Sequence, residues 1–217
     1  MSQNLKKLVI IGASGFGREV LWTISDHNNV EYRYNVLGYI DDDPTLINQK
    51  IHDLPVLGNV EWLTKNLDTN VKCVLAIGNC KIRKHIAQII QKSGFSFETI
   101  IHPSVKYSKS VKIGSGTIIQ AGCVITVDVT IGENVHMNLN TTVGHDSIIE
   151  NFVTLNPGVH VNGNTTIGEG TYVGSGTVMK QDLDIGEWAT IGAGTVLVTD
   201  VPSKTLFLWT PGKILKQ

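Results

Sequence analysis

The sequence predicts two joined domains, an α/β domain over residues 1–101 followed by an all-β parallel β-helix over residues 102–217. Three observations support this fold class. A six-residue repeat runs through the second half, strand patterns alternate with helical patterns in the first, and the 217 residues include 22 glycines but only 6% aromatics. Such a composition is typical of repetitive β structure rather than of a helical protein.

Composition and charge exclude several classes of protein. A formal charge of −1 lacks the basic excess that nucleic-acid binding usually needs, and no apolar run approaches the roughly 20 residues of a membrane span. The N-terminal residues show no secretory signal, and the cysteines Cys73, Cys80 and Cys123 lack CxxC spacing. We therefore expect a cytoplasmic protein with reduced cysteines that binds no nucleic acid.

The first domain reads as strands alternating with helices, the pattern of a parallel sheet covered by helices. Strands are expected at residues 8–11, 36–40 and 71–77, and helices at residues 15–26, 61–66 and 81–92. Because open parallel sheets bind ligands at the carboxyl ends of their strands, the segments that follow each strand are candidates for a site.

The first strand is followed by a glycine-rich loop, GASGFG, at residues 12–17. Its backbone N–H groups and the start of the next helix can meet a pyrophosphate, which makes Gly12, Ser14, Gly15 and Gly17 candidate substrate-binding residues. The G-x-x-G-x-G order departs from the dinucleotide pattern G-x-G-x-x-G, and the domain holds only one mononucleotide-binding half. An NAD-dependent oxidoreductase is therefore disfavoured.

The other two strands end in polar segments. Asp41 and Asp42 of YIDDDP could accept hydrogen bonds from a ribose or base, and Gly78 and Asn79 follow the third strand. Each segment also has an interpretation without a ligand: glycines often serve only a turn, an aspartate run is also typical of a solvated loop, and Lys81 and Arg83 could cap a helix face. Their coincidence at one sheet edge favours a ligand site.

The second domain divides from Val105 to Asp200 into 16 hexads without a slip, and the third position is aliphatic in 15 of them. Because strand side chains alternate, the first and third positions should face a core and the second should face outward. Gly, Asn, Asp and Glu at the remaining positions suit corners. Such units must stack to bury their apolar face, so the repeat predicts a β-helix.

The same frame predicts where particular side chains lie. Cys123 occupies an inward first position and should be buried, whereas Ile119 and Ile149, interpreted as outward, and Val127, in a corner, suggest flat apolar faces that pack in a homotrimer. His136 and His160 occupy outward positions on different faces. No three histidines converge, so we expect no metal site.

Four segments, GASGFGRE, YIDDDP, AIGN and IIHPSV, together with the hexad array, resemble the NeuD/PglD family of bacterial sugar O- and N-acetyltransferases. The resemblance implies a Rossmann-like nucleotide-sugar domain joined to a left-handed β-helix with three hexads per turn. It also implies a homotrimer that binds acetyl-CoA between neighbouring prisms, with active sites between subunits.

The most specific match to the family is the segment TVGHD, where a histidine precedes an acidic residue, here His145 and Asp146. Stacking by 18 residues places His145 between Val127 and Gly163. His145 would then act as general base, Asp146 would hold its tautomer, and the Gly163 amide could stabilise an oxyanion. From chemistry alone, a corner histidine is more often a solvated polar residue.

The resemblance also implies residues for the acyl donor and the acceptor. Gly163, Ser175, Ala193 and Lys213 are assigned to acetyl-CoA, although LWTPGKILK near the C-terminus departs from the family's usual G-x-P-A-K. Asn138 could orient substrate or simply occupy a corner.

The expected function is acetyl-CoA-dependent N-acetylation of a nucleotide-linked 4-amino-4,6-dideoxyhexose in bacterial surface polysaccharide or glycan biosynthesis. O-acetylation of a sialic acid or a related sugar is the alternative within the enzyme class. A non-catalytic nucleotide-sugar-binding trimeric scaffold is a further alternative, against which the His145–Asp146 pair argues.

Overall fold

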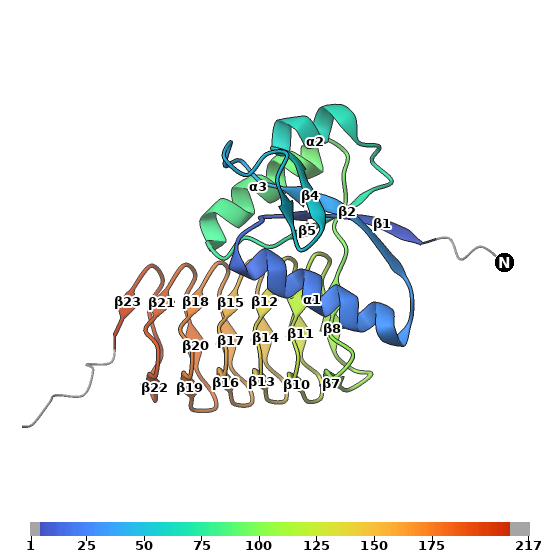
Figure 1. The fold of residues 1–217 in the computed structure, drawn as a ribbon. Coiled ribbons are helices and arrows are strands. Elements are labelled where there is room, and N and C mark those ends of the chain that lie inside the picture. The colour runs from blue at the N-terminus through green and yellow to red at the C-terminus, as the bar shows by residue number, and fades with distance from the viewer. Residues whose placement is uncertain (1–4, 209–217) are drawn as a thin grey trace, which may run out of the picture.

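The computed structural model describes residues 5–208 and shows an α/β domain seated on one side of a β-helical prism (Figure 1). The expected residue Lys213 lies outside the described residues. Within the described range, no helix has both the length and the apolar character that a membrane crossing requires. Both expected folds are present, and their order along the chain is the predicted one.

The α/β domain is built on a five-stranded sheet of order β3-β4-β2-β1-β5. Its strands are β1 (Lys6–Ile11), β2 (Tyr34–Ile40), β3 (Lys50–Ile51), β4 (Leu54–Gly58) and β5 (Lys72–Leu75), and its helices are α1 (Gly15–Val30), α2 (Val60–Asn66) and α3 (Cys80–Lys92). All neighbouring pairs are parallel except β3 with β4. The sequence prediction missed β3 and β4.

The hairpin of β3 and β4 was missed because its signals are unusual. His52 and Asp53 both have left-handed backbone, with φ of 49° and 63°, and form the tight turn that joins the two strands. Such turns normally carry Asn or Gly. Pro55, the second residue of β4, also argues against a strand, because proline has no N–H to donate to a strand ladder.

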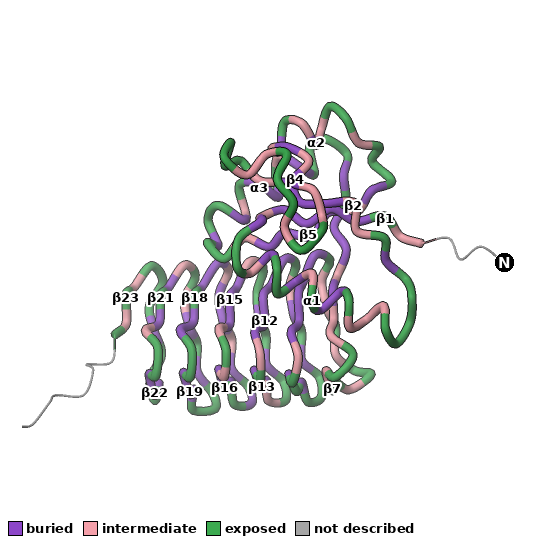
Figure 2. Tube along the Cα trace, in the orientation of Figure 1, coloured by how far each residue is buried: buried purple, intermediate pink, exposed green. Residues whose placement is uncertain are grey.

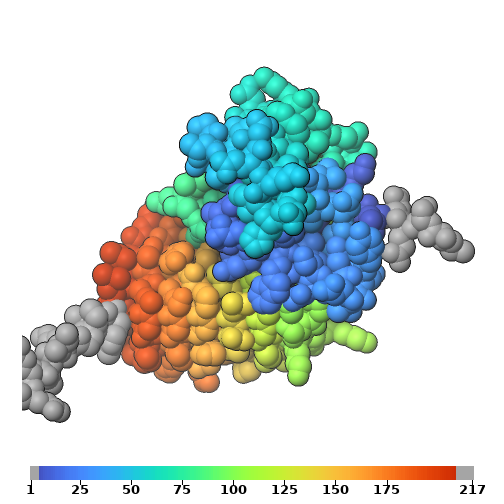
Figure 3. Space-filling model, in the orientation of Figure 1, coloured from blue at the N-terminus to red at the C-terminus, as the bar shows by residue number. Residues whose placement is uncertain are grey.

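The sheet of the α/β domain separates two apolar cores, one on each of its faces. Helices α2 and α3 pack on one face of the sheet, where Leu63 and Ile90 are fully buried. Helix α1 packs on the other face, and that second core also contains Ile100 and Ile118 of the prism. The two domains therefore share apolar packing and are not joined by a linker alone. In Figure 3 their atoms meet directly on the face in view.

Every strand of the prism is two residues long and belongs to one of three parallel faces. The first face is β6 (Ile100–Ile101), β9 (Ile118–Ile119), β12 (His136–Met137), β15 (Thr154–Leu155), β18 (Tyr172–Val173), β21 (Thr190–Ile191) and β23 (Leu206–Phe207). The second is β7 (Lys106–Tyr107), β10 (Val124–Ile125), β13 (Thr142–Val143), β16 (His160–Val161), β19 (Val178–Met179) and β22 (Val196–Leu197). The third is β8 (Lys112–Ile113), β11 (Thr130–Ile131), β14 (Ile148–Ile149), β17 (Thr166–Ile167) and β20 (Asp184–Ile185).

The register of the prism is the predicted one. Thr142 pairs with His160 and Val143 with Val161, so equivalent residues of successive turns are 18 apart. Third-position residues such as Leu155 form the core, and Cys123 is fully buried as expected. Figure 2 shows buried segments that recur along the length of the prism. Strand β6 lies just ahead of the expected domain boundary and already pairs with β9.

The prediction that Ile119 and Ile149 face outward is wrong. Both are third-position residues with 0% exposure in the prism core. The outward residues of those hexads are Ile118, which the α/β domain covers completely, and Ile148, which is 45% exposed. Val127 is exposed in its corner, as expected. Among these residues, Ile148 and Val127 are therefore the exposed ones.

Candidate active site

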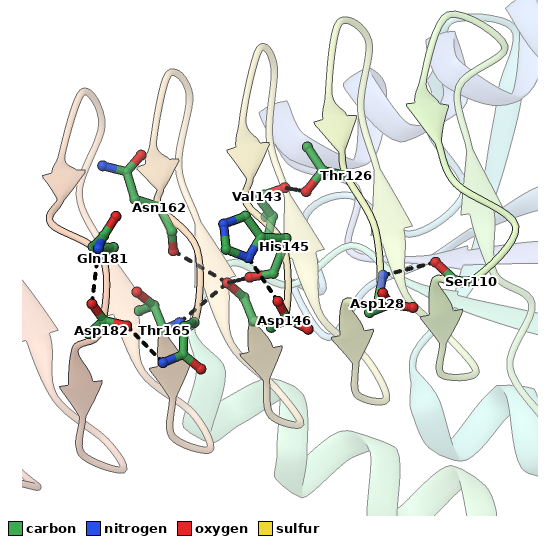
Figure 4. Close-up of polar contacts among 12 residues, drawn as sticks. Ser110, Thr126, Asp128, Val143, His145, Asp146, Asn162, Thr165, Gln181 and Asp182 are labelled. Atoms are coloured by element: carbon green, nitrogen blue, oxygen red, sulfur yellow. Dashed lines mark hydrogen bonds and ion pairs between the residues drawn. The ribbon is translucent and has the colours of Figure 1, made fainter.

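His145 and Asp146 form the corner between β13 and β14, where the chain turns from the second face to the third (Figure 4). Asp146 has a left-handed φ of 59°, a conformation that Asp tolerates better than most residues. The imidazole Nδ1 of His145 lies 2.8 Å from Oδ2 of Asp146, and both side chains are largely exposed. Because an ionised carboxylate only accepts hydrogen bonds, it favours the tautomer with hydrogen on Nδ1 and leaves Nε2 free to accept a proton.

Gly163 lies directly beside His145, as stacking by 18 predicts. The Asn164 N–H donates to the His145 carbonyl at 2.7 Å, and a Cβ atom on Gly163 would stand 2.6 Å from Nε2 of His145. Within residues 5–208 the Gly163 N–H donates to no protein acceptor. The corner therefore presents an oriented imidazole, which can act as a general base, next to a free backbone N–H, which can stabilise an oxyanion.

A separate cleft of about 710 Å³ lies where the α/β domain meets the first face of the prism. Both domains line it: Phe16, Glu19, Gly78, Asn79, Cys80 and Lys81 come from α1, α3 and the segment before α3, and His136, Asn138, Thr154, Asn156, Pro157, Gly170, Tyr172, Trp188 and Thr190 come from the prism. Its mixed polar and aromatic walls suit a ligand with a sugar and a charged group.

Three expected substrate-binding residues lie in this cleft, namely Gly78, Asn79 and Asn138. The Oδ1 atom of Asn79 accepts the N–H groups of Lys81 and Ile82 at the start of α3, so its amide NH₂ remains available to a ligand. Among the hydrogen bonds of the described residues, Asn138 takes part only through its backbone N–H and carbonyl groups, so its side chain has no protein partner. Both amides are therefore free to donate into the cleft.

The glycine-rich loop lies beside the cleft, and its residues divide into two groups. Gly12 and Gly17 serve packing, because a Cβ atom on Gly17 would stand 2.0 Å from the Gly12 carbonyl oxygen. Ser14 and Gly15 are exposed at the start of α1, where the Ser14 side chain caps nothing. This leaves the N-terminus of α1 open to an anion.

The two expected acidic residues contact backbone N–H groups. Asp41 accepts from Ala13 N–H at 2.8 Å and from Asp43 N–H at 3.0 Å, so it joins the end of β2 to the glycine-rich loop. Asp42 accepts from Val60 N–H at the start of α2. The expected meeting of the strand ends is present, and these carboxylates help to build it.

The sequence analysis did not predict that His136 is buried between the two domains. It is outward-facing as expected, but the α/β domain covers it so that only 1% is exposed. Its Nε2 lies 2.9 Å from the Leu75 carbonyl oxygen and its Nδ1 lies 3.2 Å from Nη1 of Arg83. Since the carbonyl only accepts and the guanidinium only donates, His136 is the neutral Nε2–H tautomer. Burial, and then the Arg83 charge, hold its pKa well below 6.5.

Comparison with known proteins identifies the family. Residues 7–90 match the PglD N-terminal domain, and residues 146–181 match the bacterial transferase hexapeptide repeat. The chain is 32% identical over 178 residues to the GDP-perosamine N-acetyltransferase of Escherichia coli O157:H7, which covers 79% of this chain and 77% of the relative. The chain belongs to the PglD/NeuD-like family.

Solved structures of PglD/NeuD-like proteins agree with the whole fold. The acetyltransferase domain of PglB from Neisseria gonorrhoeae FA1090, in complex with acetyl coenzyme A, has a TM-score of 0.86 and 30% identity over 98% of this chain and 100% of that one. PerB from Caulobacter crescentus, in complex with CoA and GDP-perosamine, has a TM-score of 0.87 and 28% identity over the full length of both chains.

In this PglD/NeuD-like chain the expected site residues lie at two different corners. His145 and Gly163 occupy the corner between the second and third faces, whereas Ser175 and Ala193 are exposed at the corner between the first and second faces. The Gly194 N–H donates to the Ser175 carbonyl, so Ser175 and Ala193 lie above one another in successive turns of this corner. Within one chain the second face separates the two columns.

Proposed function

We propose that the protein is an acetyl-CoA-dependent N-acetyltransferase that acts on the amino group of a nucleotide-linked 4-amino-4,6-dideoxyhexose. The observation that carries this proposal is the His145–Asp146 pair, with an Nδ1–Oδ2 distance of 2.8 Å, held against the free amide of Gly163. The E. coli relative is named an N-acetyltransferase of GDP-perosamine, which favours an amine acceptor over a sugar hydroxyl and GDP as the nucleotide.

In the proposed reaction, the neutral sugar amine attacks the thioester carbonyl carbon. Nε2 of His145 takes a proton from that nitrogen, while Asp146 stabilises the imidazolium through Nδ1–H. The Gly163 N–H donates to the oxyanion. Collapse of the tetrahedral intermediate breaks the carbon–sulfur bond, and the proton returns from His145 to the CoA thiolate.

The proposed acceptor site combines the cleft with the adjacent sheet edge. The amide groups of Asn79 and Asn138 bind polar groups of the sugar, and the N-terminus of α1 at Ser14 and Gly15 binds the diphosphate. The carboxylates of Asp41 and Asp42 accept from the nucleoside through the lone pairs that their backbone contacts leave.

The proposed assembly is a homotrimer with each active site between two subunits. The position of His145 supports this proposal. His145 lies at the corner between the second and third faces, whereas the cleft of the same chain lies against the first face. Acetyl-CoA would lie between the Gly163 corner of one copy and the Ser175–Ala193 corner of the next, where small residues leave room beside the backbone.

The exposed apolar residues support such packing. Val127 lies in the same corner one turn before His145, and Ile148 lies in β14, which follows the corner; they are 48% and 45% exposed. The proposal includes activity in the cytoplasm, where acetyl-CoA and nucleotide sugars are made.

The activity is tested by incubating the protein with acetyl-CoA and a panel of GDP-, UDP- and dTDP-linked 4-amino sugars. Thiol release and a product heavier by one acetyl group are expected with at least one amine, most rapidly with the GDP sugar. The matched hydroxy sugars and the His145→Ala variant serve as controls. Absence of thiol release with every amino sugar would refute the proposal, and transfer to the hydroxy sugars alone would indicate an O-acetyltransferase.

The shared site is tested by complementation. Co-expression of His145→Ala with an Asn138→Ala/Asn79→Ala variant should restore activity that neither has alone, because some interfaces then pair an intact histidine with an intact cleft. Light scattering should show a trimer. A monomer, or the absence of complementation in verified mixed trimers, would contradict the shared-site arrangement.

A further inference from the structure

Arg83 of α3 is completely buried between the two domains. Its guanidinium donates to five backbone carbonyl oxygens: Ile77 at 2.7 Å, Gly78 at 3.3 Å, Asn134 at 3.1 Å, Phe152 at 2.6 Å and Val153 at 3.3 Å. It also contacts Nδ1 of His136 and Oγ1 of Thr154. No carboxylate within the described residues pairs with it.

The charge of Arg83 persists in this environment. Burial lowers the pKa of Arg83 to about 10, which still leaves it protonated at neutral pH. A buried cation without a countercharge is unfavourable unless its hydrogen bonds are satisfied, and here carbonyl dipoles from several segments supply them. The planar guanidinium with five N–H groups can reach these segments at once, which a lysine ammonium cannot do.

The carbonyl groups that Arg83 binds come from both sides of the cleft. Ile77 and Gly78 directly precede Asn79, whose free amide lines the cleft. Phe152 and Val153 belong to the prism corner that leads into Thr154, which lines the opposite wall. Arg83 itself does not line the cleft. Arg83 therefore connects the two walls through hydrogen bonds that lie outside the cleft lining.

We propose that Arg83 is a positioning residue for the sugar-nucleotide cleft: it holds the Gly78–Asn79 segment against the prism so that the Asn79 amide meets the bound substrate. This inference rests on the proposed function for the identity of the ligand. It predicts that loss of the guanidinium weakens acceptor binding while the acyl-transfer chemistry at His145 continues.

The competing interpretation is that Arg83 only holds the domains together. The chain offers a matched control in Thr23 of α1, which is also fully buried and hydrogen-bonds to Gln120 of the prism. Thr23 makes no contact with the segment from Ile77 to Asn79 among the hydrogen bonds of the described residues. Thr23→Val thus weakens the same interdomain interface without touching the cleft wall.

The test compares Arg83→Lys, Arg83→Gln and Thr23→Val with the wild type. Displacing a binding group by about 1 Å can cost up to about 10²-fold. Both Arg83 variants should therefore raise KM for the nucleotide sugar by about tenfold or more, with KM for acetyl-CoA and kcat within about twofold. Calorimetric titration of the GDP-linked sugar without acetyl-CoA should show the same loss of affinity. Thr23→Val should lower the unfolding midpoint and leave every kinetic constant unchanged.

Folded Arg83 variants with an unchanged KM for the sugar would overturn the assignment, as would a rise of similar size in Thr23→Val. Failure of both Arg83 variants to fold would also overturn it, because the residue would then be structural. If the wild-type chain acetylates no sugar, the proposed function fails. The calorimetric comparison would still decide whether Arg83 positions a nucleotide-sugar site.

Discussion

Gly163→Ala is the substitution that examines the His145 corner most directly. An added Cβ atom would stand 2.6 Å from both Cε1 and Nε2 of His145. The imidazole must then move to the 3.4 Å at which ordinary contact begins, a displacement of about 0.8 Å. A misplacement of about 1 Å can cost about 10²-fold in rate, so we expect kcat to fall by about 10- to 100-fold.

The same substitution should leave the fold intact. The backbone of Gly163 lies outside the left-handed region, and the imidazole that must move is largely exposed. An alanine here also reduces the conformational freedom of the unfolded chain, an effect worth about 0.4–1 kcal/mol in favour of the folded state. The unfolding midpoint should therefore be unchanged or slightly higher while activity falls.

The assay is steady-state thiol release at saturating acetyl-CoA, combined with a double-mutant cycle. If Gly163→Ala acts by displacing the imidazole, it should have little further effect in a His145→Ala background. The reasoning is refuted if Gly163→Ala retains more than about half of the wild-type kcat. A full additional loss in the double variant would instead assign the effect to the Gly163 N–H.

Three further predictions follow from other parts of the structure. His145→Ala should lower kcat by about 10²–10⁴-fold and Asp146→Asn by about tenfold. The unfolding midpoints should not change, because both side chains are exposed. A kcat within about threefold of wild type in His145→Ala would place the base elsewhere. Burial lowers the pKa of His136, so below about pH 6.5 the unfolded chain binds more protons than the folded one. The free energy of unfolding, measured with urea, should therefore fall as the pH drops from about 7.5 to about 5. The fall should be smaller in His136→Gln. Leu155→Ala should destabilise the prism by about 2–5 kcal/mol in the same assay, since Leu155 is completely buried; a loss below about 1 kcal/mol would contradict its place in the core.

The hexad repeat predicted the prism, and the three hexads per turn that the family resemblance implies then paired His145 with Gly163. In a β-helix each residue contacts the residue one turn later, so the contacts repeat at a fixed separation that can be counted along the chain. The alternation of inward and outward positions is equally local. The error at Ile119 and Ile149 was a misassigned position within a correct frame, and the burial of both residues follows from the frame itself.

The sequence also placed Asp41 and Asn79 at the edge where the glycine-rich loop lies, because the topology of a parallel sheet brings strand ends together. It did not reveal what these residues contact. That Asp41 accepts the Ala13 N–H, and that Asn79 caps α3 with one half of its amide, depends on loop conformations that no periodic pattern describes.

The docking of the α/β domain on the first face was decided only by the tertiary structure. It buries His136, encloses Arg83 and creates the cleft from residues that are 50 to 70 or more positions apart in sequence. Viewed along the sequence, His136 resembles any outward prism residue and Arg83 resembles any polar residue on an amphipathic helix. Their burial depends on the relative orientation of two domains, which is determined by the fit of two complete surfaces and has no counterpart in a repeat of six residues.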